Sequence, residues 1–494
     1  MDILRGKRLE PLAPEAVEFT SSAKDDPALI GSVIKINLAH MVMLTEKGIV
    51  PRHQGAACLT GLLSLPPDLQ LDPALEDVHM NIEAAVVREA GEEAGGQLNL
   101  GKSRNDQVAT ALRMVLREHV LAALTGLLTV RSVLLDLSEK HRQTGLPGYT
   151  HLQHAQPVTL AHHLLAHHDA FERDTQRLFE AFPRVNLSPM GAAALATSTI
   201  GVDRRMVASL LGFEGIVGNS IDAVSARDFA LEVLSDLALL MTDVSRLAEE
   251  LILWSTEEFG MVEMPDTFSS TSSIMPQKKN PVLAELLRAK ASTVHGCLFT
   301  ALSLLRALPY SYNLDLQELT PSIWRASDAA RSSLKVLPGM LSELRFKEDR
   351  LHQLLTRDDS LATDVAEHLS TRYGIPFRTA HQVVGALARR ATESQTPFLN
   401  VVIEELEGVL KQATRRTISL DRAELRSLLR VEESIRRRAT EGGPSPDSVD
   451  SMIDTRRRLL KADRDELKGL EDFLRAAELR LSAKVSELQG GERQ

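Results

Sequence analysis

The first segment that could carry chemistry is the unbroken polar run GKSRNDQ at residues 101–107. It lies where a long apolar pattern begins, so we expect it at the N-terminus of a helix. Free backbone N–H groups there, together with Arg104 and Asn105, are well suited to hold a carboxylate. A plain helix cap, provided by Ser103 or Asn105, is the alternative interpretation.

A second segment lies between Pro147 and Pro157 and contains Thr150 and His151. The two prolines restrict the backbone, which predicts a fixed loop that presents both side chains to a ligand. Histidine is the natural proton carrier near neutral pH, so His151 is a candidate acid or base. The alternative is an ordinary solvated loop histidine.

The third segment, SSIMPQKKNP at residues 272–281, follows the small hydroxyl residues 269–271. Small residues let such a loop move, and Lys278 and Lys279 bring positive charge that stabilises carboxylates. A polar surface loop has a similar composition. That alternative does not explain why the segment joins an expected core helix directly at Pro281.

Two histidines, His163 and His167, stand four residues apart, as zinc ligands on a helix do. No glutamate lies between them, and no third ligand is evident nearby in the sequence. We therefore interpret them as ordinary helix histidines, and the sequence predicts no metal site.

Long helices must position these segments. Apolar residues recur at steps of three and four across residues 225–254, which predicts one uninterrupted helix of about 45 Å. Similar patterns cover residues 106–140, 159–182 and 281–308. Aromatic residues make up only 4% of the chain, which also favours packed helices. We expect an all-α fold with an elongated central bundle, whose apolar faces exceed what one chain covers and so invite self-association.

The chain divides into three expected helical domains. Prolines such as Pro66 and Pro67 interrupt the first hundred residues, and a charged helical stretch at residues 450–488 lies near the end of the chain. The expected divisions are an N-terminal helical domain at 1–102, a central long-helix bundle at 103–350 and a C-terminal helical domain at 351–494.

Composition excludes several classes of function. The formal net charge is −10 and the basic residues are scattered, which argues against a nucleic-acid partner. The two cysteines lie far apart, as is typical of a reducing compartment. The first eight residues turn polar before a signal peptide could form, and Arg131 and Asp136 interrupt the most apolar run, residues 120–137. We expect a cytoplasmic protein without a membrane partner.

Taken together, the three polar segments resemble the signature regions of the argininosuccinate lyase branch of the fumarase and aspartase superfamily. They match those regions in order and spacing, and the likeness spans residues 19–453. Further agreement comes from residues 76–79, 219–223, 227–229, 312–313 and 315–318. The resemblance implies a cofactor-free cleavage of argininosuccinate into arginine and fumarate. It also implies a fumarase/aspartase-like homotetramer, in which long helices form a shared core and each active site is assembled from three subunits.

The resemblance also implies roles for single residues. Ser272 corresponds to the catalytic serine of a mobile loop, which removes the proton next to a carboxylate. His151 belongs to the second signature, and Glu285 matches the acid that pairs with this histidine. Binding of the small-molecule substrate is implied for Ser22, Asp26, Ser103, Arg104, Asn105, Thr150, Ser273, Lys278, Asn280, Tyr312 and Gln317. Four of these, Ser22, Asp26, Tyr312 and Gln317, match positions that contact the amine side of the substrate.

The chemistry of such a reaction justifies these residue types independently. A C–H group beside a carboxylate is a very weak acid, so the carbanion must be stabilised as an aci-carboxylate by donors and cations. Lys278, Asn280 and Asn105 have that character. Serine is a poor base at its ordinary pKa, so it must be activated by nearby N–H groups and positive charge in a site that excludes water.

Several positions depart from the family pattern. Residues 190–194 replace a Gly-Ser-Gly-Ala pattern, Thr271 stands where the loop normally has glycine, and Leu319-Thr320 replaces an Asp-Lys pair. The missing lysine removes a charge near the amine side of the substrate. Two substrates therefore stay open: argininosuccinate, and another N-succinyl amine such as an ethylenediamine-disuccinate-type aminocarboxylate. An inactive structural homologue is a third alternative, against which the intact catalytic segments argue.

Overall fold

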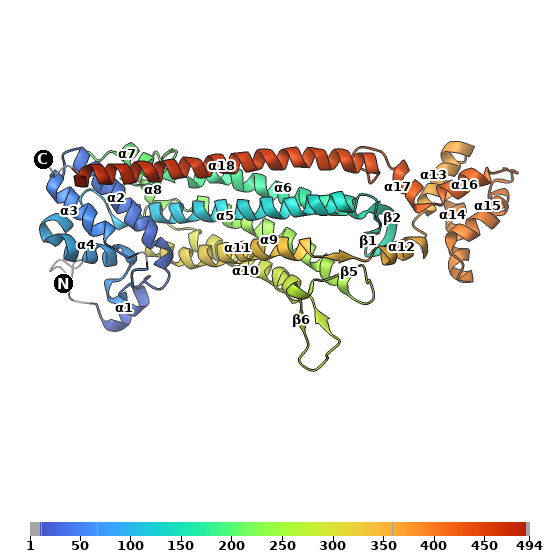
Figure 1. Cartoon of the computed structure of the whole chain (residues 1–494), viewed down its shortest axis with the longest axis horizontal. Coiled ribbons are helices and arrows are strands. Elements are labelled where there is room, and N and C mark those ends of the chain that lie inside the picture. Colours follow the sequence, from blue (N-terminus) through green and yellow to red (C-terminus); the bar gives the residue numbers. More distant parts are fainter. Residues whose placement is uncertain (1–9, 11, 67, 358, 491–494) are drawn as a thin grey trace.

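The computed structural model describes residues 10, 12–66, 68–357 and 359–490 of the chain. Apart from four short two-stranded sheets, the regular elements of this part are helices, which confirms the predicted all-α fold. The molecule is an elongated rod, with the N-terminal helices at one end and a cluster of short helices from residues 348–437 at the other (Figure 1). The first eight residues, for which the sequence predicts no signal peptide, lie outside the described part.

Four helices form the N-terminal end of the rod. The second of them is buried along nearly its whole length, because apolar residues occupy almost every face of it. Gly91 has a φ of 80° and interrupts the fourth helix. The bounds are α1 Pro14–Thr20, α2 Ile30–Glu46, α3 Arg52–Leu63 and α4 Val78–Gly95, with single 3-10 turns at Pro27–Leu29 and Pro73–Leu75.

Five long helices form the central bundle, and four of them are the helices predicted from apolar periodicity. Their interfaces share one apolar core. The helix predicted at residues 225–254 begins later, at Asp228, because Ala226 and Arg227 leave the helical conformation after a separate short helix. The bundle consists of α5 Arg104–Lys140, α6 Leu160–Val185, α9 Asp228–Ser255, α10 Val282–Leu305 and α11 Leu319–Ser342. Three smaller helices beside it are α7 Arg204–Leu210, α8 Ser220–Ser225 and the 3-10 helix η4 Leu314–Glu318.

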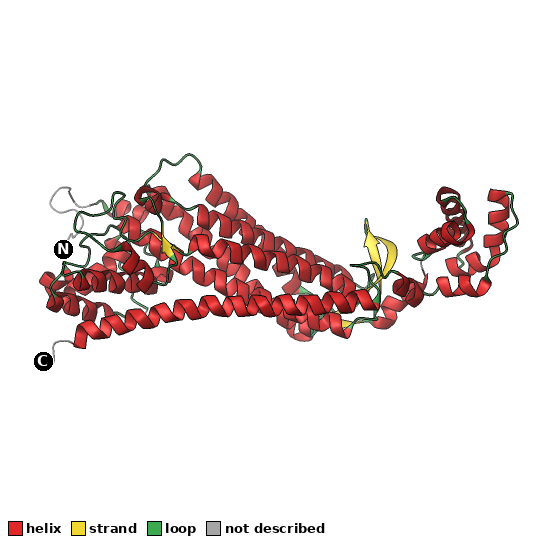
Figure 2. Ribbon diagram, turned by 90° about the horizontal axis from the view of Figure 1, so that it is seen from above, coloured by secondary structure: helices red, strands yellow, loops and turns green. Residues whose placement is uncertain are grey.

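The charged stretch near the C-terminus forms α18, Pro446–Gly490, a helix of 45 residues that runs back along the bundle to the N-terminal end (Figures 1 and 2). Buried Arg131 of α5 donates to Asp463 of α18 at 2.5 Å and lies 3.4 Å from Glu172 of α6. Leu460 joins the core of the bundle, and Leu481 joins the core of the N-terminal helices. The helix therefore ties the two cores together.

The remaining helices form a separate core at the far end of the rod. Leu355, Leu387, Val402 and Ile435 lie in it, apart from the core of the bundle. The division of the chain at residues 102 and 350 stays a prediction; α18 belongs by sequence to the third predicted domain but packs against the cores of the first two. The bounds are α12 Glu348–Arg357, α13 Ala362–Tyr373, α14 Phe377–Ser394, α15 Phe398–Thr414, α16 Arg422–Leu428 and α17 Val431–Arg437.

The strands are short, and two pairs of them form hairpins that carry predicted site residues. The first hairpin pairs β1, Gly145–Thr150, with β2, Gln153–Thr159. The second pairs β6, Ser270–Thr271, with β7, Lys279–Asn280, and projects from the side of the bundle (Figure 1). The other pairs are β3 Leu187–Ser188 with β4 Gly215–Ile216, and β5 Val262–Glu263 with β8 Arg345–Phe346.

Two helical segments in the described part, Pro27–Glu46 and Arg104–Lys140, are long and apolar enough to cross a membrane. In their most apolar windows, 78% and 56% of the residues are buried inside the protein. Their apolar character is that of core helices, which fill the N-terminal core and the bundle.

Candidate active site

The N-terminus of α5 forms the first part of the candidate site. Ser103 caps the helix: its hydroxyl accepts a bond from the backbone N–H of Asn105 at 3.3 Å. The fully buried carboxylate of Asp106 completes a capping box by accepting from the backbone N–H of Ser103 at 3.0 Å. The cap and the predicted carboxylate site therefore occupy the same place.

Asp106 also holds the loop that departs from the family pattern. Its second oxygen accepts from the backbone N–H groups of Gly191 and Ala193 at 3.0 and 2.8 Å. Asn105 donates from its side-chain amide to the carbonyl of Ala194 at 3.1 Å. Residues 190–194 therefore lie against the start of α5, and one buried carboxylate fixes both segments.

Arg104 is positioned by two acids at the start of α4. Its guanidinium donates to Asp77 at 2.8 Å and to Glu76 at 3.3 Å. Both acids agree with the family pattern, but the sequence alone predicts no role for them. It also predicts no role for Asp106, although this residue lies in the first signature segment. The signal for Asp106 is its spacing of three residues from the Ser103 cap.

Replacement of Asp106 by alanine is expected to destabilise the fold and the site together. The backbone N–H groups of Ser103, Gly191 and Ala193, of which that of Gly191 is buried, lose their acceptor, at a cost of about 2–4 kcal/mol of unfolding free energy. Urea unfolding followed by circular dichroism measures this loss. The exposed Asp328→Ala, which removes only a surface ion pair to Arg331, is the matched control. Equal unfolding midpoints for the two variants would contradict the role given to Asp106.

A small cavity of about 100 Å³ beside α1 and η4 gathers the residues predicted to contact the amine side of the substrate. Ser22, Asp26, Tyr312 and Gln317 line it together with Thr320, the residue that replaces the family's lysine. The cavity is smaller than the roughly 300–1,000 Å³ of ligand pockets that enclose a small molecule. It can therefore hold only part of a substrate within one chain.

Hydrogen bonds fix the walls of this cavity. The hydroxyl of Ser22 donates to Asp26 at 2.7 Å, and Gln317 donates from its side-chain amide to the carbonyl of Thr20 at 3.0 Å. Burial raises the pKa of Asp26 to about 6, against the hydrogen bonds from Ser22 and the backbone of Val78, which lower it. Burial also raises the pKa of the Tyr312 phenol.

Thr150 and His151 lie at the tip of the β1–β2 hairpin, where the sequence predicts a fixed loop. His151 and Leu152 have φ values of 56° and 57°, which makes a two-residue turn with both central residues in the left-handed region. Asparagine and glycine are the usual residues there, so the backbone of His151 is strained. Gly148 is required in the strand, because a side chain there would come within 2.6 Å of the carbonyl of Gln156.

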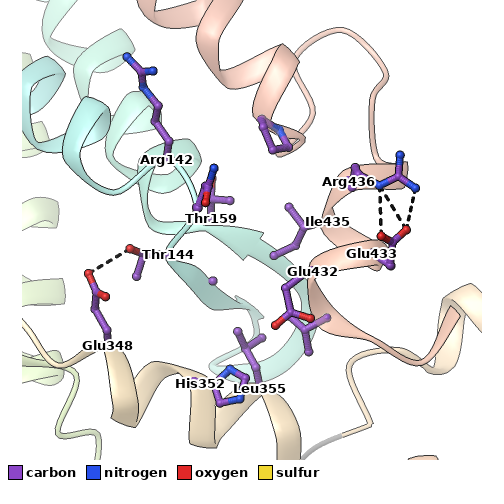
Figure 3. A pocket seen from close by; sticks show the side chains of 14 residues that line it. Arg142, Thr144, Thr159, Glu348, His352, Leu355, Glu432, Glu433, Ile435 and Arg436 are labelled. Carbon is purple, nitrogen blue, oxygen red and sulfur yellow. Dashed lines mark hydrogen bonds and ion pairs between the residues drawn. The ribbon is translucent and has the colours of Figure 1, made fainter. Parts of the chain in front are cut away.

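The base of this hairpin rests on the C-terminal helices. A cavity of about 390 Å³ lies between β1, α12 and α17, lined by Thr144, His352 and Ile435 among others (Figure 3). Thr144, just before β1, donates to Glu348 of α12 at 3.2 Å. The described residues that line this cavity include none of the predicted site residues. This region therefore belongs to the contact between the hairpin and the C-terminal helices, and we do not assign it to the site.

The β6–β7 hairpin carries Ser272, the residue for which the sequence predicts the role of base. The Ser272 hydroxyl oxygen accepts from the backbone N–H groups of Ile274 and Met275 at 3.3 and 3.1 Å. Two donors aimed at this oxygen stabilise its anionic form. The neighbouring apolar side chains of Ile274 and Met275 are 83% and 40% exposed at the end of this loop.

The two lysines of this loop differ in their surroundings. Lys279 forms ion pairs with Asp266 at 2.5 Å and Glu263 at 3.4 Å, which join the hairpin to the segment that precedes it. Within the part of the chain that the structure describes, Lys278 makes no ion pair, so its ammonium group is available to a substrate carboxylate. Asn280 pairs with Ser270 in the short ladder, and Glu285 is exposed on the first turn of α10.

A single chain does not bring these groups together. Arg104 starts α5, and the His151 hairpin follows the other end of this 37-residue helix, which is about 55 Å long. The Ser272 hairpin projects from the side of the bundle between the two (Figure 1). Among the hydrogen bonds and ion pairs of the described residues, none joins His151 to Glu285.

Comparisons with known proteins identify the family of the chain. The family described as "Lyase" matches residues 63–296, and the one described as "Argininosuccinate lyase C-terminal" matches residues 359–436. The argininosuccinate lyase of Methanothrix thermoacetophila is 48% identical over 93% of this chain and 94% of its own length. Those of Methanocaldococcus jannaschii and Methanothermobacter thermautotrophicus are 41% and 44% identical, over 98% and 94% of this chain and the full length of each relative.

Solved structures show the same fold. EDDS lyase in complex with formate has a TM-score of 0.89 and 30% identity, covering 100% of this chain and 99% of its own. A fumarate lyase from Mesorhizobium sp. BNC1 has a TM-score of 0.74 and 23% identity, over 88% and 98% of the two chains. The second likeness concerns the fold alone. With relatives of up to 48% identity along almost its whole length, the chain belongs to the argininosuccinate lyase family of the fumarase and aspartase superfamily.

Proposed function

We propose that this carbon–nitrogen lyase cleaves argininosuccinate into arginine and fumarate at sites formed where polar groups of different subunits meet. The observation that carries the proposal is the Ser272 hydroxyl, held by two backbone N–H groups on a projecting hairpin. The test is direct: purified protein is incubated with argininosuccinate, and fumarate is followed by its ultraviolet absorbance. An absence of fumarate would contradict the proposal.

The reaction divides between the three groups of residues. Ser272 takes the proton from the carbon next to the substrate carboxylate, and the electron pair of that C–H bond moves onto the carboxylate. Lys278, with donors such as Asn105 and Asn280, stabilises the resulting aci-carboxylate. The C–N bond then breaks, fumarate forms, and His151, paired with Glu285, returns a proton to the departing nitrogen. No step requires a cofactor.

A homotetramer would bring Arg104, His151 and Ser272 of different chains close to one another. The lightly buried α10 exposes Leu286, Phe299 and Leu302, whose side chains are 59%, 72% and 49% exposed. Leu239 on the adjoining α9 is 47% exposed. Such an apolar face on long bundle helices favours association with the same face of other copies. Association around these helices would bring the distant ends of different chains together, in a protein that we expect in the cytoplasm.

The raised pKa of Asp26 predicts a pH dependence of substrate binding. Below about pH 6 this carboxyl is neutral and cannot attract the cationic amine side of argininosuccinate. We expect KM to rise about tenfold at pH 5 relative to pH 8, because only about one tenth of the Asp26 carboxyl groups are ionised at pH 5. Initial rates across this range measure it. The isosteric Asp26→Asn should have a high KM that does not change with pH, and a variant that keeps the wild-type profile would refute the assignment.

A second substrate has two observations in its favour. Thr320 lines the amine-side cavity in place of a lysine, and EDDS lyase has a closely similar fold. Identity favours argininosuccinate, because the argininosuccinate lyases reach 48% whereas EDDS lyase is 30% identical. Parallel assays of argininosuccinate and of fumarate with a panel of amines distinguish the two. Faster turnover of ethylenediamine with fumarate than of argininosuccinate would favour the second substrate.

A further inference from the structure

We propose that His163, His167 and Glu250 form a binding site for a divalent transition metal of the zinc class between α6 and α9. The Nε2 atoms of His163 and His167 lie 2.6 and 2.8 Å from the same carboxylate oxygen of Glu250. The three ligand atoms all lie within 4.8 Å of one another. Glu250 is the third ligand that the sequence around the two histidines lacks.

The arrangement needs little change to accept a metal. In a tetrahedral zinc site with bonds of about 2.0–2.1 Å, neighbouring ligand atoms are about 3.3 Å apart. Each nitrogen-to-oxygen distance would therefore open by roughly half an ångström. The spacing of four residues places both histidines on one face of α6, toward α9.

Charge and access also suit a cation. A carboxylate oxygen can only accept, so the Nε2 atoms of His163 and His167 donate their protons to Glu250, and a metal ion that binds there displaces these protons. The side chains of His163, His167 and Glu250 are 28%, 11% and 35% exposed, which leaves an approach from solvent and room for a water as fourth ligand.

The neighbouring group of similar composition lacks these properties. His168, Asp169 and Glu172 also cluster within reach of a common ion. However, Arg456 donates to Asp169 at 2.5 Å and Arg131 lies 3.4 Å from Glu172, so the positive charge of two guanidinium groups is already in place. A metal ion would be repelled there.

The position of the proposed site suggests a stabilising role. His163 and His167 lie on the first turns of α6, directly after the hairpin that carries His151. A metal ion would tie this end of α6 to α9 and so fix the root of the hairpin. We expect metal to raise the thermal unfolding temperature, because it binds the folded chain alone.

Cobalt titration of the full-length, EDTA-treated protein tests the proposal. We expect one Co²⁺ per chain, intense visible absorption bands of tetrahedral cobalt, and quenching of Trp254, whose ring centroid lies 5.0 Å from that of His163. Zn²⁺ should displace the cobalt and remove the bands. Equilibrium dialysis that finds no bound cobalt at micromolar concentration, or binding without these bands, would overturn it.

Two variants and a matched control localise the binding. His167→Ala and the isosteric Glu250→Gln should bind at least about 100-fold more weakly, since even outer-shell partners are worth roughly 10–100-fold in metal affinity. His162→Ala removes a histidine from the same helix whose Nε2 contacts the carbonyl of Gly442, and it should bind as the wild type does. Circular dichroism checks that each variant is folded. Unchanged binding by folded Glu250→Gln, or equal loss in His162→Ala, would show adventitious histidine binding and refute the site.

Discussion

Ser272→Ala is expected to lower kcat for argininosuccinate by about 10³–10⁴-fold, the upper range for loss of a general base. The Ser272 hydroxyl accepts bonds from the N–H groups of both Ile274 and Met275, which stabilise its anionic form. Alanine removes the proton acceptor but disturbs little else, because the hairpin is exposed and water can bond to the two freed N–H groups. Stopped assays with high enzyme concentration measure the residual rate.

A serine at the base of the same hairpin provides the control. The hydroxyl of Ser269 donates to the carbonyl of Pro265 at 2.7 Å. We expect Ser269→Ala to keep kcat within a few-fold of the wild-type value. Both variants should retain the wild-type helical signal in circular dichroism. If Ser272→Ala kept a tenth of the activity or more, Ser272 would not be the base.

His151→Asn is expected to lower kcat by about 10²–10⁴-fold while leaving the hairpin intact. Asparagine is well tolerated at a φ of 56°, so the substitution removes the proton carrier and relieves backbone strain. Steady-state rates measure the loss of the proton carrier. Thermal unfolding measures the relief of backbone strain, and we expect an unchanged or higher unfolding temperature.

Leu152→Asn is the matched substitution in the same turn. Leu152 has a φ of 57° and a side chain that is 68% exposed, and it offers no titrating group. This variant should retain most of the activity. Loss of activity equal to that of His151→Asn would show that the turn itself, and not the imidazole, is required.

The bundle was predictable because its helices bury continuous apolar stripes. The patterns at residues 106–140 and 159–182 match α5 and α6 to within a few residues. The hairpin at Pro147 to Pro157 was not predictable as strands, since its turn residues, His151 and Leu152, carry none of the Asn-Gly signal that usually marks such a turn.

Long-range contacts explain what else escaped prediction. Glu250 lies more than eighty residues from His163 and His167, so sequence spacing gives no hint of a third ligand. Asp106 had a local signal as a capping residue, but its bonds to Gly191 and Ala193 depend on the folded loop. The candidate active-site residues lie on elements that are far apart in one chain, and the proposed assembly of several chains would join them.

Mixed oligomers test this central claim most directly. His151→Asn and Ser272→Ala chains, each inactive alone, are co-expressed with different tags, and tetramers that carry both tags are assayed for fumarate formation. If each site takes His151 and Ser272 from different chains, about one quarter of the sites in an equal mixture contain both intact residues. We predict activity near one quarter of the wild-type value.

The control pair combines Ser272→Ala with Lys278→Ala. Both residues lie on the same hairpin of one chain, so no site in the mixture receives both intact side chains, and no activity should return. Restored fumarate formation in the His151 and Ser272 mixture alone is the result that the shared site predicts. Inactive mixed tetramers of that pair, correctly assembled and folded, would contradict it.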